Sequence, residues 1–263
     1  MARLRLGLAL GGGSARGWAH LGTIDALTEL GIRPDIVCGT SIGALVGAVY
    51  VTGRLDALRA RAEKMTWRDG VKMLDLRIAR GGLIDGAKIR AFLDQLRCTG
   101  DIETLATPFA AVATDVENGE EVWLRSGPIG DAVRASIGLP GLFLPCAREG
   151  RWLLDGGLVN PVPVSLCRAL GADVVIAVDV NSSRMVPAKA GMPSYFDALA
   201  RSVTIMQVQI TRARLASEPA DVLLVPELGD VGPFQFDRAY DSIGEGRACV
   251  ARSRDALVAL LTR

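Results

Sequence analysis

A short apolar run that ends in glycine and leads into a helical pattern occurs twice near the start of this chain. The first unit is LALGGGSARGWAHLG at residues 8–22, and the second is CGTSIGAL at residues 38–45. Gly31 and Pro34 end the first helical pattern. We predict strands at 4–10 and 36–38 and helices at 18–30 and 42–52. Strand followed by helix, repeated, is typical of an α/β domain with a parallel sheet.

The rest of the chain continues this pattern. DVVIAVDV at 173–180 is apolar on both faces, as expected for a central parallel strand. Further strands are predicted at 109–114, 121–124, 152–154 and 222–225, and helices at 87–97, 128–136, 163–170, 194–216 and 241–262. No repeat or linker interrupts them, so residues 1–263 are expected to form one domain.

The helix predicted at 194–216 carries one apolar stripe, which we expect to face the core. Its members are Phe196, Leu199, Val203, Met206, Ile210 and Ala213. The segment at 67–80, by contrast, has mixed polarity and weak periodicity. Such a segment is a candidate for a lid or an interfacial surface over an active site.

The composition limits the classes of function. Hydrophobic residues make up 49% of the chain, and 30 basic residues nearly balance 29 acidic ones, which gives no electrostatic case for nucleic acid. The five cysteines form no CxxC pair, so we expect no disulfide framework and no metal site. The apolar run at 6–10 is shorter than the ~7–15 residues of a signal peptide core. We expect a cytoplasmic protein that can contact a membrane surface peripherally.

The second glycine turn contains Gly39-Thr40-Ser41-Ile42-Gly43, which matches the G-x-S-x-G pattern of a nucleophile on a strand-to-helix turn. The flanking glycines are expected because no Cβ fits at such a turn. Ser41 would then expose its hydroxyl near the positive end of the following helix. The alternative is an ordinary helix N-cap formed by Thr40 or Ser41.

A nucleophilic serine normally needs a base, and the chain has a single histidine, His20. His20 precedes the serine, contrary to the order of an α/β-hydrolase triad, and we expect it to brace the first glycine loop. The candidate base is Asp155, which ends a predicted strand in WLLDGGLVNPVPV and precedes Gly156 and Gly157. Because Asp-Gly is also a common turn signal, a simple turn is the alternative.

Three motifs together make the chain similar to bacterial patatin-like phospholipases, in the group related to neuropathy target esterase. They are Gly11-Gly12-Gly13-Ser14-Ala15-Arg16-Gly17, then Gly39-Thr40-Ser41-Ile42-Gly43, then Asp155-Gly156-Gly157. GGLIDGAKI at 81–89, ATDVENGE at 113–120 and RASIGLPGLFLP at 134–145 agree with this resemblance. The motif-bearing part spans about residues 4–180.

The resemblance implies a three-layer α/β/α sandwich with a mainly parallel central sheet, and catalysis by a Ser-Asp dyad without cofactor or metal. Ser41 carries over as nucleophile and Asp155 as base. Gly12, Gly13 and Arg16 are the oxyanion-hole positions of the first loop. Ser14 stands where relatives often have a fourth glycine, so the motif alone does not fix which N–H groups face the oxyanion.

The implied activity is hydrolysis of a lipid ester, such as a lysophospholipid or a phospholipid, through an acyl-enzyme. Apolar side chains for the acyl group are expected from Leu139, Leu142, Phe143 and Leu144. Arg16 is expected to brace the first loop, with contact to a phosphate head group as the alternative. The sequence carries no indication of oligomeric state.

Three other functions remain to be weighed against hydrolysis. An acyltransferase or thioesterase would use the same dyad, and a lipid-binding regulatory protein would keep the fold without catalysis. Nucleotide binding is not supported, because residues 11–17 do not match G-x-G-x-x-G and Trp18 stands where a P-loop needs lysine.

Overall fold

The computed structural model describes residues 3–66, 86–183 and 195–261. The strands are β1 (Leu6–Leu10), β2 (Ile36–Thr40), β3 (Phe109–Asp115), β4 (Glu121–Leu124), β5 (Cys146–Arg148), β6 (Arg151–Asp155), β7 (Val174–Val178) and β8 (Val222–Leu224). The helices are α1 (Ala19–Glu29), α2 (Ile42–Val51), α3 (Leu55–Glu63), α5 (Ala87–Gln95), α6 (Ile129–Ser136), α7 (Val164–Ala169), α8 (Tyr195–Ser217), α9 (Ala239–Arg252) and α10 (Arg254–Leu261). Two short 3-10 turns, η1 (Ser14–Trp18) and η4 (Gly156–Leu158), follow β1 and β6.

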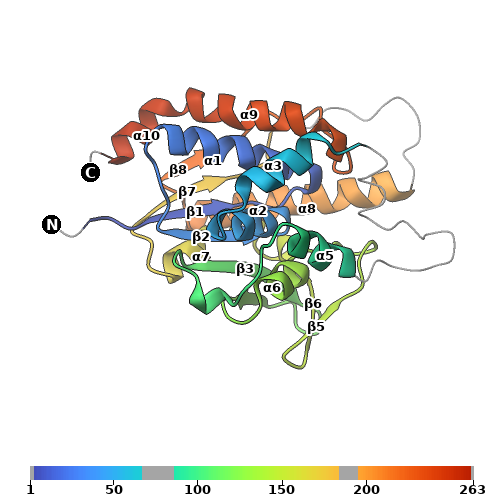
Figure 1. Ribbon diagram of the computed structural model, residues 1–263. Coiled ribbons are helices and arrows are strands. Elements are labelled where there is room, and N and C mark those ends of the chain that lie inside the picture. Colours follow the sequence, from blue (N-terminus) through green and yellow to red (C-terminus); the bar gives the residue numbers. More distant parts are fainter. Residues whose placement is uncertain (1–2, 67–85, 184–194, 262–263) are drawn as a thin grey trace.

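Within these ranges the strands form one sheet in the order β5-β6-β3-β2-β1-β7-β8, with β4 beside β3. The five strands from β3 to β8 in that order pair in parallel. The strands β4, β5 and β6 pair antiparallel. The helices α1, α2 and α9 pack into the core on one face of the sheet, and α7 packs into the core on the other face. Figure 1 shows α1 and α9 side by side at the top of the view. The predicted three-layer sandwich with a mainly parallel sheet is therefore confirmed.

Each face of the sheet has its own hydrophobic core, and β1 contributes to both because successive residues of a strand point to opposite faces. Leu6, Leu8 and Leu10 belong to the larger core. Ala9 belongs to the smaller core beneath α7. A Cβ on Gly7 would come within 2.8 Å of the Ala172 Cβ, so only glycine allows this close approach on the α7 side.

Three elements differ from the prediction. The helix α3 was not predicted, since only two of its residues are buried and its apolar signal is weak. The edge strand β5 is three residues long and has no fully buried residue, so it too gives little pattern. The single helix predicted at 241–262 is two helices, α9 and α10, with a break at Ser253. The candidate lid at 67–80 lies outside the described residues.

The predicted core-facing stripe of α8 is right only in part. Val203 is buried and Leu199 and Ile210 are half-buried, but Met206 is 49% exposed and Ala213 is exposed. The buried face of the described part of α8 is Ala200, Val203, Thr204, Gln207, Val208 and Thr211. This face lies against η4 and lines a pocket that contains Ser41 and Asp155. Thr204 and Gln207 are polar, yet they are buried because they form part of the pocket wall. A pattern of apolar residues alone cannot predict such a face.

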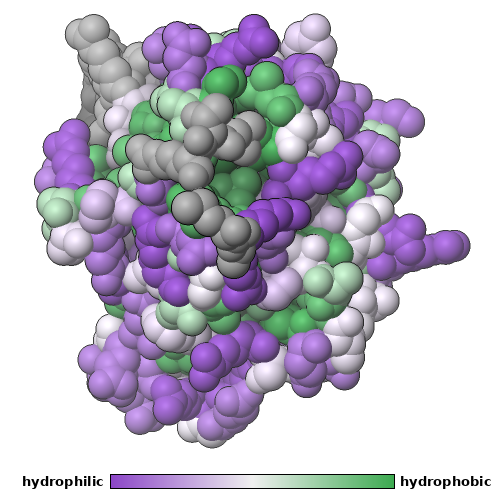
Figure 2. Space-filling model, turned by 90° about the vertical axis from the view of Figure 1, so that its left-hand side faces the viewer, coloured by the Kyte–Doolittle hydropathy of each residue, from purple (hydrophilic) through white to green (hydrophobic). Residues whose placement is uncertain are grey.

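The two ends of the parallel strands differ in character. In Figure 1, β1 begins and α10 ends at the left. Figure 2 views that end, where hydrophilic residues surround smaller hydrophobic areas. Ser41 follows the carboxyl end of β2, at the opposite end of the sheet, where open α/β sheets bind their ligands. Among the described helices, none is both long enough and apolar enough to cross a bilayer.

Candidate active site

Ser41 joins β2 to α2 in a strained backbone conformation. Its φ is 56° and its ψ is −123°, a region that costs a non-glycine residue about 1–3 kcal/mol. A Cβ on Gly39 would lie 2.4 Å from the Gly43 carbonyl oxygen, and one on Gly43 would lie 2.1 Å from the Leu10 carbonyl oxygen. No side chain fits at either glycine, so the turn stays tight and Ser41 projects from it.

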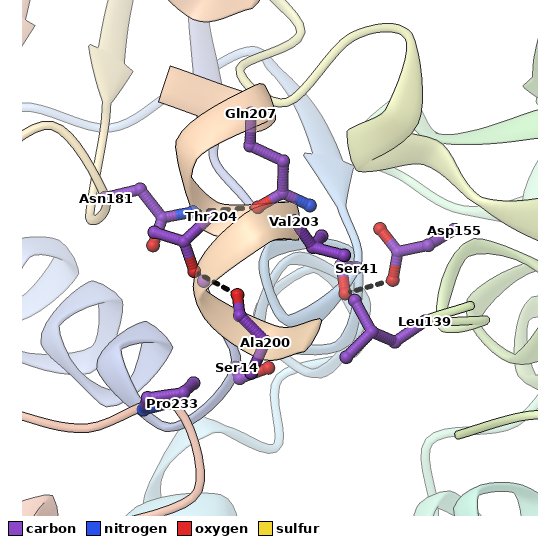
Figure 3. Close-up of a pocket in the computed structure, with 11 residues that line it drawn as sticks. Ser14, Ser41, Leu139, Asp155, Asn181, Ala200, Val203, Thr204, Gln207 and Pro233 are labelled. Atoms are coloured by element: carbon purple, nitrogen blue, oxygen red, sulfur yellow. Dashed lines mark hydrogen bonds between the residues drawn. The ribbon is translucent and has the colours of Figure 1, made fainter. Parts of the chain in front are cut away.

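The hydroxyl of Ser41 is bonded to a carboxylate. Ser41 Oγ donates to Asp155 Oδ2 at 2.7 Å, as Figure 3 shows. The strand β3 aligns the two residues, because Thr40 pairs with Val112 and Asp155 pairs with the adjacent Ala113. Positions 114 apart in the sequence thus become neighbours.

The alternative interpretation of Ser41 as a helix cap does not hold, because no side chain caps the first turn of α2. The hydroxyl of Thr40 donates instead to the carbonyl oxygen of Asn160 at 2.8 Å. The turn therefore leaves the Ser41 hydroxyl available for chemistry.

Asp155 is a buried carboxylate with three hydrogen-bond donors. It is 1% exposed, and its Oδ1 accepts from the Gly157 amide at 2.9 Å. Its Oδ2 accepts from the Gly138 amide at 3.3 Å as well as from Ser41. Burial raises the pKa of Asp155, and the bonds from Ser41, Gly157 and Gly138 partly offset that rise. Asp155 is thus a stronger base than a solvated aspartate, and its charge is still stabilised.

Two residues of the RASIGLPGLFLP signature hold backbone near the dyad, and the sequence alone did not predict this role. The Ser41 amide donates to the hydroxyl of Ser136 at 2.8 Å, and Ser136 is fully buried. The buried guanidinium of Arg134 donates to the carbonyl oxygens of Ile137 and Leu144 at 3.1 and 2.8 Å. Ser136 therefore fixes the backbone at Ser41, and Arg134 fixes the loop that follows α6.

The amides of the first glycine loop fall into two groups. Gly11 donates to the Val178 carbonyl oxygen and Gly12 to the Pro161 carbonyl oxygen, both at 2.9 Å. The amides of Gly13 and Ser14 have no acceptor within the described residues. Ser14 has a φ of 50°, and both residues line the pocket of Ser41. The Gly12 amide is thus occupied, whereas those of Gly13 and Ser14 remain available to an oxyanion.

Arg16 holds the first glycine loop in place through hydrogen bonds of its side chain and its amide. Its guanidinium is buried and donates to the Val231 carbonyl oxygen at 2.8 Å and to Asn181 Oδ1 at 3.2 Å. Its amide donates to the Gly13 carbonyl oxygen at 3.2 Å. These bonds brace the loop, as expected of the simpler role for Arg16. A Cβ on Gly17 would lie 2.3 Å from the Ile42 side chain, so the two glycine turns pack directly together.

His20 also braces the first loop. It is fully buried in α1, and its Nε2 bonds the Gly11 carbonyl oxygen at 2.8 Å. Burial lowers the pKa of His20 to about 4, so the ring is neutral and Nε2 carries the proton. Its Nδ1 has no partner in the described part of the chain. His20 lines neither pocket at Ser41, as expected for a histidine without a catalytic role.

Two chambers meet at the dyad and share Ser14, Ser41, Leu139 and Asp155. The polar chamber is also lined by Gly13, Asn181, Ala200, Val203, Thr204, Gln207 and Pro233. The apolar chamber is also lined by Ile42, Leu45, Ile89, Ile137, Leu142, Phe143, Phe234 and Phe236. The predicted acyl-group residues Leu139, Leu142 and Phe143 are among these linings, but Leu144 is 42% exposed and belongs to neither.

The profile of the patatin-like phospholipase family matches residues 8–168. The chain belongs to the patatin-like phospholipase family. This membership covers all three motifs, since Gly11, Ser41 and Asp155 lie inside the matched range. Among the described residues of this patatin-like phospholipase, no cluster of three or more metal-ligand side chains occurs.

Relatives of this family member include an NTE family protein of Mycobacterium tuberculosis, 40% identical over 190 residues. That match covers 72% of this chain and 53% of the relative, so the chain spans about half the length of the mycobacterial protein. Lysophospholipase nte1 of Aspergillus fumigatus is 38% identical over 181 residues, which cover 67% of this chain and 12% of the relative.

The solved structure of VipD from Legionella pneumophila has a similar fold. Its TM-score is 0.52 at 14% sequence identity, and the match covers 97% of this chain and 67% of that one. At this identity the likeness concerns the fold alone.

Proposed function

We propose that this chain hydrolyses lipid esters through a Ser41–Asp155 dyad and an acyl-enzyme intermediate. The observation that carries the proposal is the 2.7 Å hydrogen bond from Ser41 Oγ to Asp155 Oδ2, at the junction of a polar and an apolar chamber. Membership of the patatin-like phospholipase family and the likeness to a lysophospholipase support it. The family supports the class of reaction, and the residues of the site suggest which group acts in each step.

Acylation begins when Ser41 Oγ attacks the ester carbonyl carbon while its proton passes to Asp155 Oδ2. The new C–O bond leaves a negative charge on the former carbonyl oxygen. When this intermediate collapses, the bond to the alcohol breaks and Asp155 returns the proton to the departing alkoxide. The products at this stage are the free alcohol and an acyl group esterified to Ser41.

Deacylation repeats the same proton transfers with water. Asp155 accepts a proton from a water molecule as its oxygen attacks the acyl carbon. The tetrahedral intermediate then releases the fatty acid, and Asp155 returns the proton to Ser41 Oγ. The raised pKa of Asp155 assists both proton abstractions, because it brings the carboxylate closer to the basicity of the groups it serves.

The oxyanion is assigned to the amides of Gly13 and Ser14, which lie beside Ser41 and have no other acceptor within the described residues. One donor of this kind contributes about 3 kcal/mol to transition-state stabilisation. Of the positions predicted from the motif, this assignment keeps Gly13 and replaces Gly12 and Arg16 with Ser14. Gly12 and Arg16 then hold the loop in shape, through Pro161 and Asn181 respectively.

The two chambers support the proposed class of substrate. The apolar chamber has an empty volume of about 560 Å³, including its opening to solvent, and is assigned to the acyl chain. The polar chamber is assigned to the alcohol side of the ester. An ester with one long apolar arm and one polar arm, such as a lysophospholipid or a phospholipid, fits this division. The proposal includes peripheral contact with a lipid surface, where such esters are found.

The proposal is tested with a panel of a short soluble ester, a lysophospholipid, a diacyl phospholipid and an acyl-CoA. The wild-type protein should release fatty acid fastest from one of the lipid esters. A fluorophosphonate probe should label Ser41, as read by mass spectrometry. Fastest turnover of acyl-CoA would point instead to a thioesterase, and binding of lipid without product release would indicate a regulatory protein.

Asp155→Asn sharpens this test, because it removes the base and keeps the size of the side chain. We expect kcat/KM to fall by about 10²–10⁴-fold, the usual contribution of a general base. In the wild type, kcat/KM should decline as the pH falls through the pKa of Asp155, because the base must be ionised. Since burial raises that pKa, the decline should begin at a higher pH than for an ordinary aspartate. An acidic limb at the ordinary value would contradict this role for Asp155.

A further inference from the structure

Gln207 places an amide donor beside the dyad, and the steps proposed above do not use it. The side chain comes from α8 and the residue is only 6% exposed. Its Oε1 accepts a hydrogen bond from Asn181 Nδ2 at 3.0 Å. Its Nε2 has no acceptor in the described part of the chain, although the residue lines the polar chamber. Figure 3 shows this nitrogen on the side of Ser41 and Asp155.

The orientation of the Gln207 amide is fixed by a chain of hydrogen bonds that starts at Arg16. A guanidinium can only donate, so the Asn181 oxygen must face Arg16, at 3.2 Å. The Asn181 nitrogen then donates to the Gly12 carbonyl oxygen and to Gln207 Oε1, both at 3.0 Å. Since this leaves the oxygen of Gln207 facing Asn181, its nitrogen must face the chamber.

The second glycine of the Asp-Gly-Gly motif makes room for this donor. A Cβ on Gly157 would lie 2.2 Å from Gln207 Nε2 and 3.0 Å from Asp155 Oδ1. Any larger residue at position 157 would therefore push the amide away from the dyad. Among the described residues, Gln207 Nε2 is not one of the fully enclosed side-chain atoms that lack a partner, so it is open to the polar chamber, where a ligand oxygen can accept from it.

We propose that Gln207 Nε2 donates a hydrogen bond to an oxygen on the alcohol side of the ester, and that Arg16 and Asn181 hold it in that orientation. The inference rests on the proposed hydrolase function. It adds a specificity: the preferred alcohol carries oxygen atoms close to the ester, as a glycerol backbone does. An aryl ester offers no such acceptor beyond the ester group itself.

The test compares two esters of the same acyl group, 1-octanoyl-glycerophosphocholine and p-nitrophenyl octanoate. Gln207→Met keeps the length of the side chain and removes the donor. We expect it to lower kcat/KM for the glycerophosphocholine ester about tenfold, mainly through KM, and for the aryl ester by less than about twofold. Gln209→Met is the matched control, because Gln209 lies on the exposed side of the same helix and should leave both rates unchanged.

Gln207→Glu gives a second variant, which keeps an oxygen for Asn181 while losing the amide donor at neutral pH. Because the new carboxylate also repels Asp155, this variant should lower both rates, and the loss should be larger for the glycerophosphocholine ester.

If Gln207→Met lowers kcat/KM equally for both esters, or for neither, the role of Gln207 is overturned and the hydrolase proposal stays intact. A wild-type protein that cleaves neither ester and is not labelled by fluorophosphonate would overturn the proposed function, and this inference with it.

Discussion

The two glycine turns at the carboxyl ends of β1 and β2 share one backbone feature and differ in chemistry. Each places a serine at positive φ, 50° at Ser14 and 56° at Ser41, at the start of a helical segment. The turn after β1 offers two backbone amides, whereas the turn after β2 offers a hydroxyl bonded to a carboxylate. The local backbone conformation of a turn therefore does not determine whether its amides or its side chain take part in the chemistry.

The neighbouring strand end makes the difference. Asp155 ends β6, which pairs with β3 beside the end of β2, so a carboxylate reaches Ser41. The turn after β1 has Asn181 beyond the end of the adjacent β7, and that amide bonds the Gly12 carbonyl oxygen. A carboxylate activates a hydroxyl, while a neutral amide only holds a loop in shape. The following predictions test this division of labour.

The largest effect is expected from exchanging the two serines for alanine. Ser41→Ala removes the nucleophile and should reduce kcat about 10³-fold or more. Ser14→Ala leaves the backbone amide in place, and serine already carries a Cβ at this positive φ, so the loss should be less than about tenfold. Initial rates on the best lipid ester measure both. Ser14→Gly is the control, since glycine adopts positive φ without strain, and a loss as large as that of Ser41→Ala would place the chemistry on Ser14.

A smaller difference in kcat is expected between alanine variants of Gly13 and Gly12, which were both predicted as oxyanion-hole positions. A Cβ on Gly13 would lie 2.4 Å from the Val180 side chain, so Gly13→Ala must shift the loop and its free amide. We expect kcat to fall about 10²-fold, as for the loss of one oxyanion donor. The nearest atom to a Cβ on Gly12 is 3.4 Å away, an ordinary contact, so Gly12→Ala should cost less than about tenfold. The reverse order would return the oxyanion to the Gly12 amide.

The smallest effect on activity is expected at His20, which braces the first turn without touching the second. His20→Gln keeps an amide donor for the Gly11 carbonyl oxygen, so kcat should change less than about tenfold, well below the loss of a general base. A loss of 10²-fold or more would make His20 part of the catalytic machinery, on the same principle.

The stability of the same variant should depend less on pH. Burial lowers the pKa of His20 from 6.5 to about 4. Between these two pH values the His20 ring is protonated in the unfolded chain and neutral in the folded one. This contribution is present above pH 6.5 and lost as the pH falls toward 4, by about 3 kcal/mol in all. Urea unfolding at several pH values should show a flatter profile in His20→Gln. An unchanged profile would mean that other groups cause the acid sensitivity.

Much of the fold followed from local patterns in the sequence. The strand-glycine-helix units predicted β1, β2, α1 and α2, and the doubly apolar run at 173–180 predicted the buried strand β7. The two elements that were missed altogether share one cause, which is a weak apolar signal: α3 buries two residues and β5 has none fully buried. The stripe of α8 misled because apolar residues such as Met206 face outward there, while Thr204 and Gln207 are buried at the pocket.

The sequence by itself determined the tight turns of the site. Gly39, Gly43 and Gly156 lie where backbone atoms would come within 2.1–2.4 Å of a Cβ, so these turns require glycine in this chain. It also excluded a Ser-His-Asp triad with a downstream histidine, because the chain contains one histidine and that one precedes the serine.

Only the tertiary structure decided which groups are paired and which are free. That Asp155 meets Ser41 depends on the register of β6 and β2 along β3. That the Gly12 amide is occupied and those of Gly13 and Ser14 are open depends on Pro161 and on the path of the loop. The direction of the Gln207 amide depends on Arg16 and Asn181, which lie far from it in the chain. Hydrogen bonds saturate, so the chemistry of a polar group is known only when its partners in space are known.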